Sequence, residues 1–419
     1  MKVLVVGGGG REHALVWKLK QSSRVEQLFC APGNGGIAKL CSCADIDSAD
    51  IKGLMHFAER KKIDLTVVGP ELPLTLGIVD RFKEKGLAVF GPSRRAAQIE
   101  GSKAFAKDLM VRAGIPTADH RTFSGIEETL DHLQTARFPM VLKADGLASG
   151  KGVMVCANRN EAYDAVDQIM RKRAFGEAGN RIVVEEYLRG EEVSVIGLTD
   201  GRSVVLLPSA QDHKAVFEGD RGPNTGGMGA CAPAPVASQK LLERVLQKIM
   251  LPVIRTMESE GCPYRGVLYA GLMITTEGPK VLEFNCRFGD PETQVILPLL
   301  ETDLVDAMMA VLEGRLDRLS LRVRDGAAVC VVMAASGYPG PYERGKPIRG
   351  LDRVPPEVLV FHSGSKRKGK KIVTSGGRVL GVTALGDTIR SAVESAYRAV
   401  GYITFDGAYY RRDIAHRAV

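Results

Sequence analysis

The chain has 419 residues, which is too long for one average hydrophobic core, so two to four domains are expected. An apolar fraction of 45% and a charged fraction of 25% are those of an ordinary soluble globular protein. No apolar run approaches the ~20 residues that cross a bilayer, which excludes a membrane-spanning chain.

A net charge of +8 favours anionic ligands or nucleic acid. The only dense basic run is Lys366–Lys371, and it lacks the interleaved aromatic residues on which bases stack. We therefore expect a solvated hairpin loop there, and neither a nucleic-acid nor a membrane partner. The eight cysteines form no C-x-x-C pair, and the N-terminus has no signal-peptide pattern, so a reducing, cytoplasmic location is expected.

The N-terminus predicts a buried strand at Lys2–Val6, a turn at Gly7–Gly10 and an amphipathic helix from Arg11. Such a turn presents backbone N–H groups to a phosphate. The dinucleotide fingerprint G-x-G-x-x-G fails, because Glu12 stands at its third glycine. A phosphate-bearing substrate is therefore favoured over NAD, with Arg11 beside the turn.

Strands and helices continue to alternate: helix 50–61, strand 65–68, helix 76–85 and strand 87–90. Gly69, Pro70 and Glu71 follow strand 65–68 at its carboxyl end, where open parallel sheets place ligands. The first ~100 residues therefore predict a small doubly wound parallel-sheet domain.

Ser102 is a good N-cap for a helix that runs to Ala113. Lys103 lies in the first turn of that helix, the unfavourable end of the helix dipole for a lysine that serves stability alone, although a surface lysine remains the alternative. Strand 139–143 ends at Lys143 and is followed by the glycine-rich segment 145–152 and strand 153–156. This is not a Walker A loop; it predicts a hinged lid over phosphates, or else a flexible surface hairpin.

A helix is expected at 161–172 and strands at 181–185 and 193–198. Between these strands, the stretch after Glu185 can offer backbone groups to an adenine edge, and Glu192 can accept ribose hydroxyls. The alternative is an exposed acidic turn.

Residues 211–230 predict a long polar loop, and ordered loops of that length are usually functional. Asp212 and Lys214 give the loop charge, whereas a lone histidine such as His213 is more often a structural hydrogen-bonding group than a base. A long helix is expected at 238–259, followed by a hairpin of strands 268–275 and 280–285.

The end of that hairpin has the highest density of candidate site residues in the sequence. Glu283 and Asn285 sit two apart, so a strand points both side chains to one face, where two oxygen ligands can hold Mg²⁺ beside phosphates. Arg287 adds a fork of donors for an anionic oxygen, and Asp290 and Glu292 add carboxylates. The alternative is a strand with a polar turn.

The tail predicts strands 327–334, 358–362 and 378–384 and a helix at 388–400, without an assignable motif.

In this order, the two lysines, the glycine-rich segment, the acidic stretch at 185–192 and the Glu283-x-Asn285 pair resemble the ATP-grasp superfamily. The stretches 8–14, 224–229 and 287–292 resemble, more specifically, its glycinamide ribonucleotide synthetase family, and the resemblance spans nearly the whole chain. One departure is that strand 268–273 lacks the metal carboxylate found in many ATP-grasp enzymes, which leaves the number of metals open.

The resemblance implies a ligase of purine synthesis that joins glycine to 5-phosphoribosylamine through a glycyl phosphate, with ATP as co-substrate and Mg²⁺ or Mn²⁺ as cofactor. Its partners would be these small molecules, with transient contact to neighbouring purine-pathway enzymes. The competing readings are another ATP-grasp carboxylate–amine ligase of purine synthesis and a non-enzymatic nucleotide- or nucleic-acid-binding protein.

The resemblance also implies roles for residues of this sequence. Metal would be held by Glu283 and Asn285, and the catalytic residues would be Arg287, Lys214 and Asp290. ATP would be bound by Lys103, Lys143, Gly146, Ser149, Gly150, Lys151, Gly152, Glu185, Glu186, Tyr187, Leu188 and Glu192. The two other substrates would be bound by Gly9, Gly10, Arg11, Glu12, Pro70, Glu71, Asp212, Lys214, Asn224, Thr225, Gly226, Gly227, Met228 and Gly229.

The expected architecture is α/β and α+β, in three domains. An N-terminal substrate-binding α/β domain would cover residues 1–101, an ATP-grasp domain residues 102–320, with its lid at about 118–190, and a small C-terminal α+β domain residues 321–419.

Overall fold

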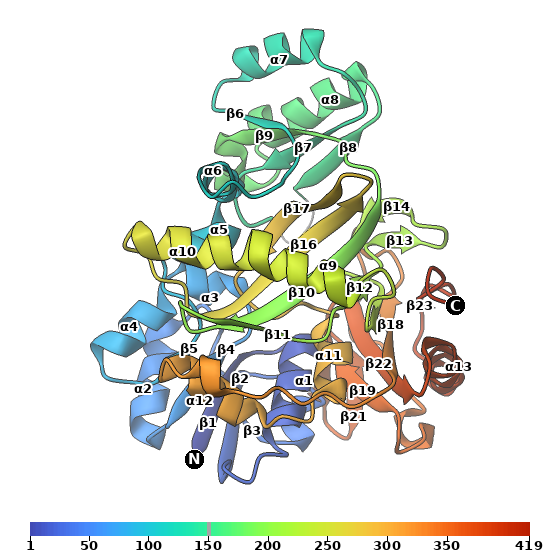
Figure 1. Cartoon of the computed structure of the whole chain (residues 1–419). Helices are drawn as coiled ribbons and strands as arrows, with labels where there is room; N and C mark the ends of the chain where they lie inside the picture. The colour runs from blue at the N-terminus through green and yellow to red at the C-terminus, as the bar shows by residue number, and fades with distance from the viewer. Residues whose placement is uncertain (149–151) are drawn as a thin grey trace.

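The computed structural model describes residues 1–148 and 152–419, so the predicted roles of Ser149, Gly150 and Lys151 lie outside the described residues. A narrow upper part stands on a wide base, in which the N-terminal segment and the C-terminal segment lie side by side (Figure 1). None of the helices in the described ranges is both long and apolar enough to cross a membrane.

The N-terminal segment forms the predicted doubly wound parallel sheet. Its strand order is β3-β2-β1-β4-β5, with bounds β1 Lys2–Gly7, β2 Gln27–Pro32, β3 Ser42–Cys43, β4 Leu65–Val68 and β5 Val89–Phe90. Its helices are α1 Gly10–Leu19, α2 Ile51–Lys61, α3 Glu71–Thr75 and α4 Ile78–Glu84. The single helix expected at 76–85 is wrong at its start, because Gly77 adopts φ +90° and separates α3 from α4.

The narrow upper part is a four-stranded antiparallel sheet of order β6-β9-β7-β8 covered by helices. The bounds are β6 His120–Phe123, α7 Ile126–Thr135, β7 Met140–Ala144, β8 Val153–Cys156, α8 Arg159–Val166, a π-helical turn at Asp167–Arg171, a 3-10 turn at Gly176–Asn180 and β9 Ile182–Glu186. Helices α5 (Gln98–Gly101) and α6 (Lys103–Arg112) lead into it. As predicted, Ser102 caps α6, its hydroxyl accepting from the Phe105 N–H over 3.1 Å. We call this part the lid.

Below the lid lies a second antiparallel sheet, of order β11-β10-β16-β17. Its strands are β10 Glu191–Thr199, β11 Val204–Leu206, β16 Gly266–Thr275 and β17 Gly278–Asn285. One long helical segment crosses its front, made of α9 Gln239–Val245, a π-helical turn at Leu246–Met250 and α10 Leu251–Ser259 (Figure 1). The predicted hairpin of β16 and β17 is confirmed, with Gly271 paired to Glu283. We call this part the core sheet.

The third sheet has the order β12-β15-β18-β22-β19, with β23 paired to β18. Its strands are β12 Gln211–Asp212, β15 Gly229–Ala232, β18 Ala327–Ala335, β19 Leu359–His362, β22 Arg378–Gly386 and β23 Ala408–Tyr409. Helices α11 Thr293–Leu299 and α13 Ile389–Val400 pack against it, whereas α12 Leu304–Leu312 packs against α1 and against β10 and β16 of the core sheet. A hairpin of β20 Ser365–Lys368 and β21 Lys371–Thr374 carries the basic run. The remaining 3-10 turns are Ile37–Lys39, Leu316–Arg318 and Leu351–Arg353.

The long loop expected at 211–230 is therefore wrong. Its ends, β12 and β15, are strands of the third sheet, and its middle is a hairpin of β13 Ala215–Phe217 and β14 Arg221–Asn224. The hairpin is anchored by the C-terminal tail. The guanidinium of Arg411, whose side chain is 0% exposed, donates to the Ala215 carbonyl over 3.0 Å and pairs with Asp220 at 3.0 Å. The Gly219 N–H donates to Asp413 over 2.8 Å.

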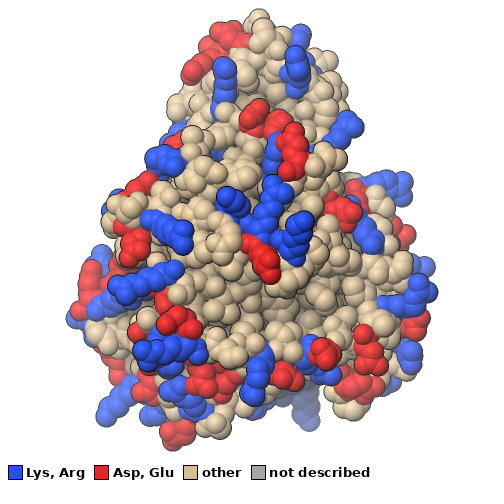
Figure 2. Space-filling view, viewed as in Figure 1, with Lys and Arg blue, Asp and Glu red and all other residues tan. Residues whose placement is uncertain are grey.

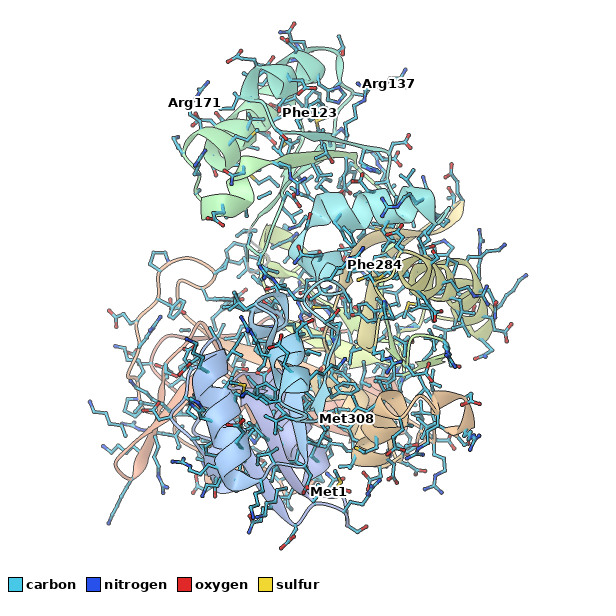
Figure 3. All side chains as sticks on the ribbon, turned by 90° about the vertical axis from the view of Figure 1, so that its left-hand side faces the viewer. Met1, Phe123, Arg137, Arg171, Phe284 and Met308 are labelled. Atoms are coloured by element: carbon cyan, nitrogen blue, oxygen red, sulfur yellow. The ribbon has the colours of Figure 1, made fainter. Side chains whose placement is uncertain are left out.

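Apolar side chains pack between the lid, the core sheet and the base. Phe284 of β17 lies between the lid, which contains Phe123, and the base, which contains Met308, whereas Arg137 and Arg171 project outward from the lid (Figure 3). Val281 and Phe284 are buried in the same apolar cluster, because a β-bulge between Val281 and Glu283 shifts the alternation of β17 by one residue. One face of β17 is thus fixed by apolar packing, and Glu283 and Asn285 lie on the other. On the outer face seen in Figure 2, acidic and basic side chains are interspersed.

Candidate active site

A cavity of about 440 Å³ lies where the lid, the core sheet and both parts of the base meet. Its walls come from α1, α6, β7, β17 and β22, which are far apart in the sequence. The charged side chains around it are Arg11, Glu71, Glu100, Lys103, Lys107, Lys143, Glu185, Asp212, Lys214, Glu283, Arg287, Asp290, Glu292 and Arg378. So many charges of both signs in one concave site favour a polyanionic ligand with bound cations.

Glu283 and Asn285 both line this cavity, because alternate residues of β17 point to the same side. Burial raises the pKa of Glu283, but Lys214, Lys143 and Lys103 outweigh it and the net pKa is lowered. Glu283 is thus an ionised carboxylate facing three ammonium groups. The Oδ1 atom of Asn285 accepts a hydrogen bond from Arg287 over 3.1 Å.

These two oxygens fit a divalent cation that is shared with phosphates. The described residues contain no cluster of three or more His, Cys, Asp or Glu side chains of the kind that encloses a metal. Mg²⁺ beside nucleotide phosphates usually takes only one or two protein carboxylates, and its remaining ligands are phosphate oxygens and water. Opposite Glu283, β16 has Gly271, which supplies no oxygen ligand from its side chain.

Three lysines approach the cavity from α6 and β7. Lys103 donates to the carbonyl oxygens of Ala144 and Gly146 over 3.0 and 2.9 Å, so it stands at the base of the glycine-rich segment. Lys143 donates to the Leu282 carbonyl over 3.0 Å and thereby connects the lid to the core sheet. Its position at the end of β7 is the one expected from the sequence.

Lys107 is a site residue that the sequence did not reveal. It lies one helical turn after Lys103 on α6, so spacing along the helix was the available signal. Its ammonium lies 3.1 Å from Oε2 of Glu185, and Lys143 lies 2.9 Å from the same oxygen. Burial lowers the pKa of Lys107 to about 8, although Glu185 opposes this. The Glu185 side chain is thus engaged with lysines, and its backbone lies in β9.

A second cavity of about 640 Å³ continues between the lid and the hairpin β13–β14. It is lined by Tyr187, Leu188, Glu192, Asn224 and Arg417, among others, and it shares Asp212 and Lys214 with the first cavity. Lys214 lies 2.9 Å from Oε2 of Glu192 and 4.0 Å from Oε1 of Glu283, so it marks the junction of the two cavities. Within the stretch 185–188, Glu185 lines the first cavity, and Tyr187 and Leu188 line the second. Glu186 pairs with Lys280 at 3.3 Å and lines neither cavity.

Asp212 is the least satisfied carboxylate of the site. Burial and Glu292 raise its pKa well above the ordinary range, and its Oδ1 atom is buried without a hydrogen-bond partner among the described residues. Glu292 is itself buried and accepts from the Tyr269 hydroxyl over 2.9 Å and from Ser194 over 3.0 Å. Tyr269 and Glu292 also line the first cavity, and no role was predicted for Tyr269 from the sequence.

Arg287 is held by two carboxylates. Its Nη2 atom lies 2.8 Å from Glu100, and its Nε atom lies 3.3 Å from Glu71. Although burial raises the pKa of Glu71, Arg287 and Arg11 lower it to about 2. Glu100, at the end of α5, was missed because nothing in its local sequence marks it.

The turn of residues 7–10 is held by Glu12. One oxygen of Glu12 accepts from the Gly9 N–H over 2.6 Å, and the other pairs with Arg11 at 2.6 Å. Gly10 has no room for a side chain, since a Cβ there would lie 2.5 Å from the Ser363 hydroxyl. Arg11 and Glu71 line the first cavity, whereas Gly9, Gly10, Glu12 and Pro70 do not line it.

The segment 224–229 divides in the same way. Thr225 and Gly226 line the first cavity, and Asn224 lines the second. Met228 and Gly229 are buried, and Gly229 begins β15. A Cβ on Gly227, whose φ is +111°, would lie 2.4 Å from Pro291, so this turn and the 287–292 stretch are in direct contact. His213 accepts from the Ala415 N–H over 3.0 Å and burial lowers its pKa to about 4, which fits a structural hydrogen-bonding role.

A lid sheet that faces a core sheet across lysines, a glycine-rich segment and a Glu-x-Asn pair defines an ATP-grasp enzyme. Comparisons with known proteins give the family. Models of phosphoribosylglycinamide synthetase match its N domain over residues 1–100, its ATP-grasp (A) domain over residues 101–293 and its C domain over residues 328–417. The chain belongs to the phosphoribosylglycinamide synthetase family.

Individual relatives agree over the full length. The chain is 54% identical over 415 residues to the phosphoribosylamine–glycine ligase of Caldanaerobacter subterraneus subsp. tengcongensis, which covers 99% of each protein. It is 52% identical to that of Allochromatium vinosum, covering 100% of this chain and 99% of the relative. The crystal structure of phosphoribosylamine–glycine ligase from Thermotoga maritima superposes with a TM-score of 0.87 at 34% identity, covering 99% and 100% of the two chains.

More distant structures share the fold. The biotin carboxylase domain of the 2-oxoglutarate carboxylase from Hydrogenobacter thermophilus has a TM-score of 0.77 at 18% identity, covering 98% of this chain and 91% of that domain.

Proposed function

We propose that this chain joins glycine to 5-phosphoribosylamine at the expense of ATP, giving glycinamide ribonucleotide, ADP and phosphate. The relatives that match over the full length carry this activity in their names. The observation that carries the proposal is the first cavity, where the ionised Glu283 and Asn285 face the ammonium groups of Lys103, Lys143 and Lys214. Phosphoryl transfer needs positioning and charge neutralisation, which these groups supply.

In this proposal the triphosphate lies along the floor of the first cavity. Lys103 and Lys143 bind the α- and β-phosphates, next to Gly146 and Gly152 in the wall of the same cavity. Mg²⁺ or Mn²⁺, held by Glu283 and Asn285, would neutralise the β- and γ-phosphates. Adenine and ribose occupy the second cavity, where Leu188 and its neighbours offer backbone groups and Glu192 accepts from ribose hydroxyls.

The chemistry proceeds in two steps. A carboxylate oxygen of glycine attacks the γ-phosphorus, the bond to the β,γ-bridging oxygen breaks, and ADP leaves. The amine of 5-phosphoribosylamine then attacks the glycyl carbonyl, the C–O bond to phosphate breaks, and the amine loses one proton. Arg287 stabilises charge on the transferred phosphoryl group, since its guanidinium presents a fork of donors to oxygen.

The glycine and 5-phosphoribosylamine sites lie on the base side of the same cavity. Asp212, Lys214 and the segment 224–229 border it on one side, and Arg11 and Glu71 border it on the other. Asp290 is ionised there, because Arg378 and Arg11 lower its pKa against the effect of burial. An enclosed site suits an acyl phosphate intermediate, which water would hydrolyse.

We also propose the three-domain division at residues 101/102 and 320/321, with the lid at about 118–190. It is supported by the parallel sheet, which ends at Phe90, and by the lid sheet, whose strands fall within 120–186. A cytoplasmic location is supported by the eight cysteines, all of which are free thiols. Finally, we propose that the protein makes transient contact with neighbouring enzymes of the purine pathway.

A coupled assay of ADP release tests the proposed function. Release is expected only when ATP, a divalent cation, glycine and 5-phosphoribosylamine are all present, and it should fall to background when any one is omitted. Glycine-independent ADP release in the presence of phosphoribosylamine would contradict the proposal. Turnover with formate or another acid in place of glycine would instead indicate a different carboxylate–amine ligase.

A further inference from the structure

One cation in the wall of the first cavity comes from the C-terminal part of the chain. Arg378 begins β22, and its guanidinium reaches out of the third sheet into the cavity. Its Nη1 atom donates to the carbonyl oxygens of Gly226 and Asp290 over 2.5 and 2.7 Å. Its Nη2 atom lies 3.1 Å from Oδ2 of Asp290. One planar group therefore holds two segments whose sequences resemble the family most specifically.

A second residue of the same sheet region supports this arrangement. The hydroxyl of Tyr338, which follows β18, accepts from the Gly226 N–H over 3.1 Å. Both backbone groups of Gly226 are thus bound by the C-terminal part. A Cβ on Gly226 would lie 2.9 Å from Cζ of Arg378, so only glycine lets the guanidinium approach this closely.

The carboxylate of Asp290 is fully engaged. Its Oδ1 atom accepts from Nε2 of Gln294 over 2.6 Å, while Oδ2 pairs with Arg378. Both its orientation and its charge therefore depend on neighbours outside its own segment. Two carbonyl oxygens and one carboxylate oxygen match the planar fork of an arginine, whereas a lysine would present a single ammonium to three acceptors.

We infer that Arg378 is a positioning residue for the acceptor side of the active site: it fixes the Asp290 carboxylate and the turn at Gly226 against one another, so the C-terminal sheet completes the site for glycine and 5-phosphoribosylamine. This inference rests on the proposed function. Arg378 acts through Asp290 and Gly226. Its partners Gly226 and Asp290 are not partners of Lys103 or Lys143, so we expect nucleotide binding to depend little on it.

Steady-state kinetics of Arg378→Met and Arg378→Lys test the inference, with Arg398→Met as a matched control, because Arg398 is exposed on α13 of the same region. For Arg378→Met, kcat/KM for glycine and for phosphoribosylamine is expected to fall about 10²-fold, the order of loss that a misplacement near 1 Å causes, with KM for ATP within about twofold of wild type. Arg378→Lys should retain an intermediate activity, because it restores the charge without the fork.

Specific kinetic results would overturn this role of Arg378. Values of kcat/KM within threefold of wild type in Arg378→Met, or an equal rise in KM for ATP, would overturn the inference. If Arg378→Met fails to fold, Arg378→Lys and Tyr338→Phe carry the test, and unchanged kcat/KM values for glycine and phosphoribosylamine in both would overturn it. A wild-type enzyme without glycine-dependent ADP release would contradict the proposed function instead, which separates the two failures.

Discussion

Nη2 of Arg287 lies 2.8 Å from Oε1 of Glu100, and the two side chains are only 18% and 7% exposed. The guanidinium is thus held at the end of β17 by a carboxylate from α5, which lies at the start of the path into the lid. An arginine held in this way is pre-oriented. A phosphoryl group that enters the site can accept hydrogen bonds from the same guanidinium without a change in its orientation. The hydrogen bond from the same guanidinium to Asn285 joins it to the pair that we propose to hold the metal.

Replacing Arg287 by lysine should therefore lower kcat more than it raises any KM. A point charge cannot make the bidentate contact that charge on the transferred phosphoryl group requires, and a loss of roughly 10²-fold in kcat is expected. Steady-state kinetics checks this, with the exposed Arg255→Lys on α10 as control. A change confined to KM for ATP would make Arg287 a ground-state contact.

Glu283→Ala should abolish turnover while leaving the fold intact. The carboxylate faces the cavity and is half-exposed, so its loss removes the proposed metal ligand without creating an apolar void. We expect kcat to fall by at least about 10²-fold, with Tm close to wild type. The control is Glu277→Ala in the turn of the same hairpin, where the side chain is 74% exposed. Near-normal kcat in Glu283→Ala would refute the metal assignment.

Lys107 gives a prediction about alkaline stability. Its pKa is about 8 in the folded protein, against a usual value of 10.5, so between these pH values the unfolded chain binds the extra proton. Stability from this group is therefore fully present above pH 10.5 and is lost as the pH falls through 8. The Tm of wild type relative to Lys107→Met should rise from pH 8 to pH 10.5; a constant difference would show that Lys107 titrates normally.

His13 and His362 predict an acid-sensitive contact between α1 and β19. The His362 N–H donates to Nδ1 of His13 over 2.7 Å, and burial lowers the two pKa values to about 3 and about 4. Their usual pKa is 6.5, so the stability they contribute is present above pH 6.5 and is lost as the pH falls towards 4.

His13→Asn keeps an acceptor near the Nδ1 position but removes the titration. Its Tm should fall less steeply than that of wild type between pH 6.5 and 4, with up to about 1.4 kcal/mol per pH unit at stake for each group. His56→Asn, at an exposed position on α2, is the control. Parallel curves for wild type and His13→Asn would exclude this explanation of acid sensitivity.

Local signals predicted much of the fold. The Ser102 cap, the strand bounds of β4 and β8 and the β16–β17 hairpin depend on neighbours in the sequence, and the structure confirms them. The polar, glycine-rich composition of 211–230 hid four short strands, because β15 is stabilised by pairing with β18, about a hundred residues later. No window of sequence contains that partner.

The residues of the candidate site also divide into those that the local sequence predicts and those that depend on distant contacts. Glu283, Asn285 and Lys143 could be found because strand periodicity fixes where their side chains point. Glu100, Tyr338 and Arg378 could not, since each reaches the cavity through a contact that spans more than one hundred positions in the chain. Lys107 was within reach, because it shares a helix face with Lys103.

The anchoring of the hairpin β13–β14 by Arg411 has a consequence for how the protein acquires its structure. The two partners Arg411 and Ala215 are 196 positions apart, so closing this contact costs the entropy of a very long loop. Such non-local contacts form late in folding. The wall of the second cavity is therefore expected to order last, and hydrogen exchange during refolding should find its amides protected only after those of β10 and β16.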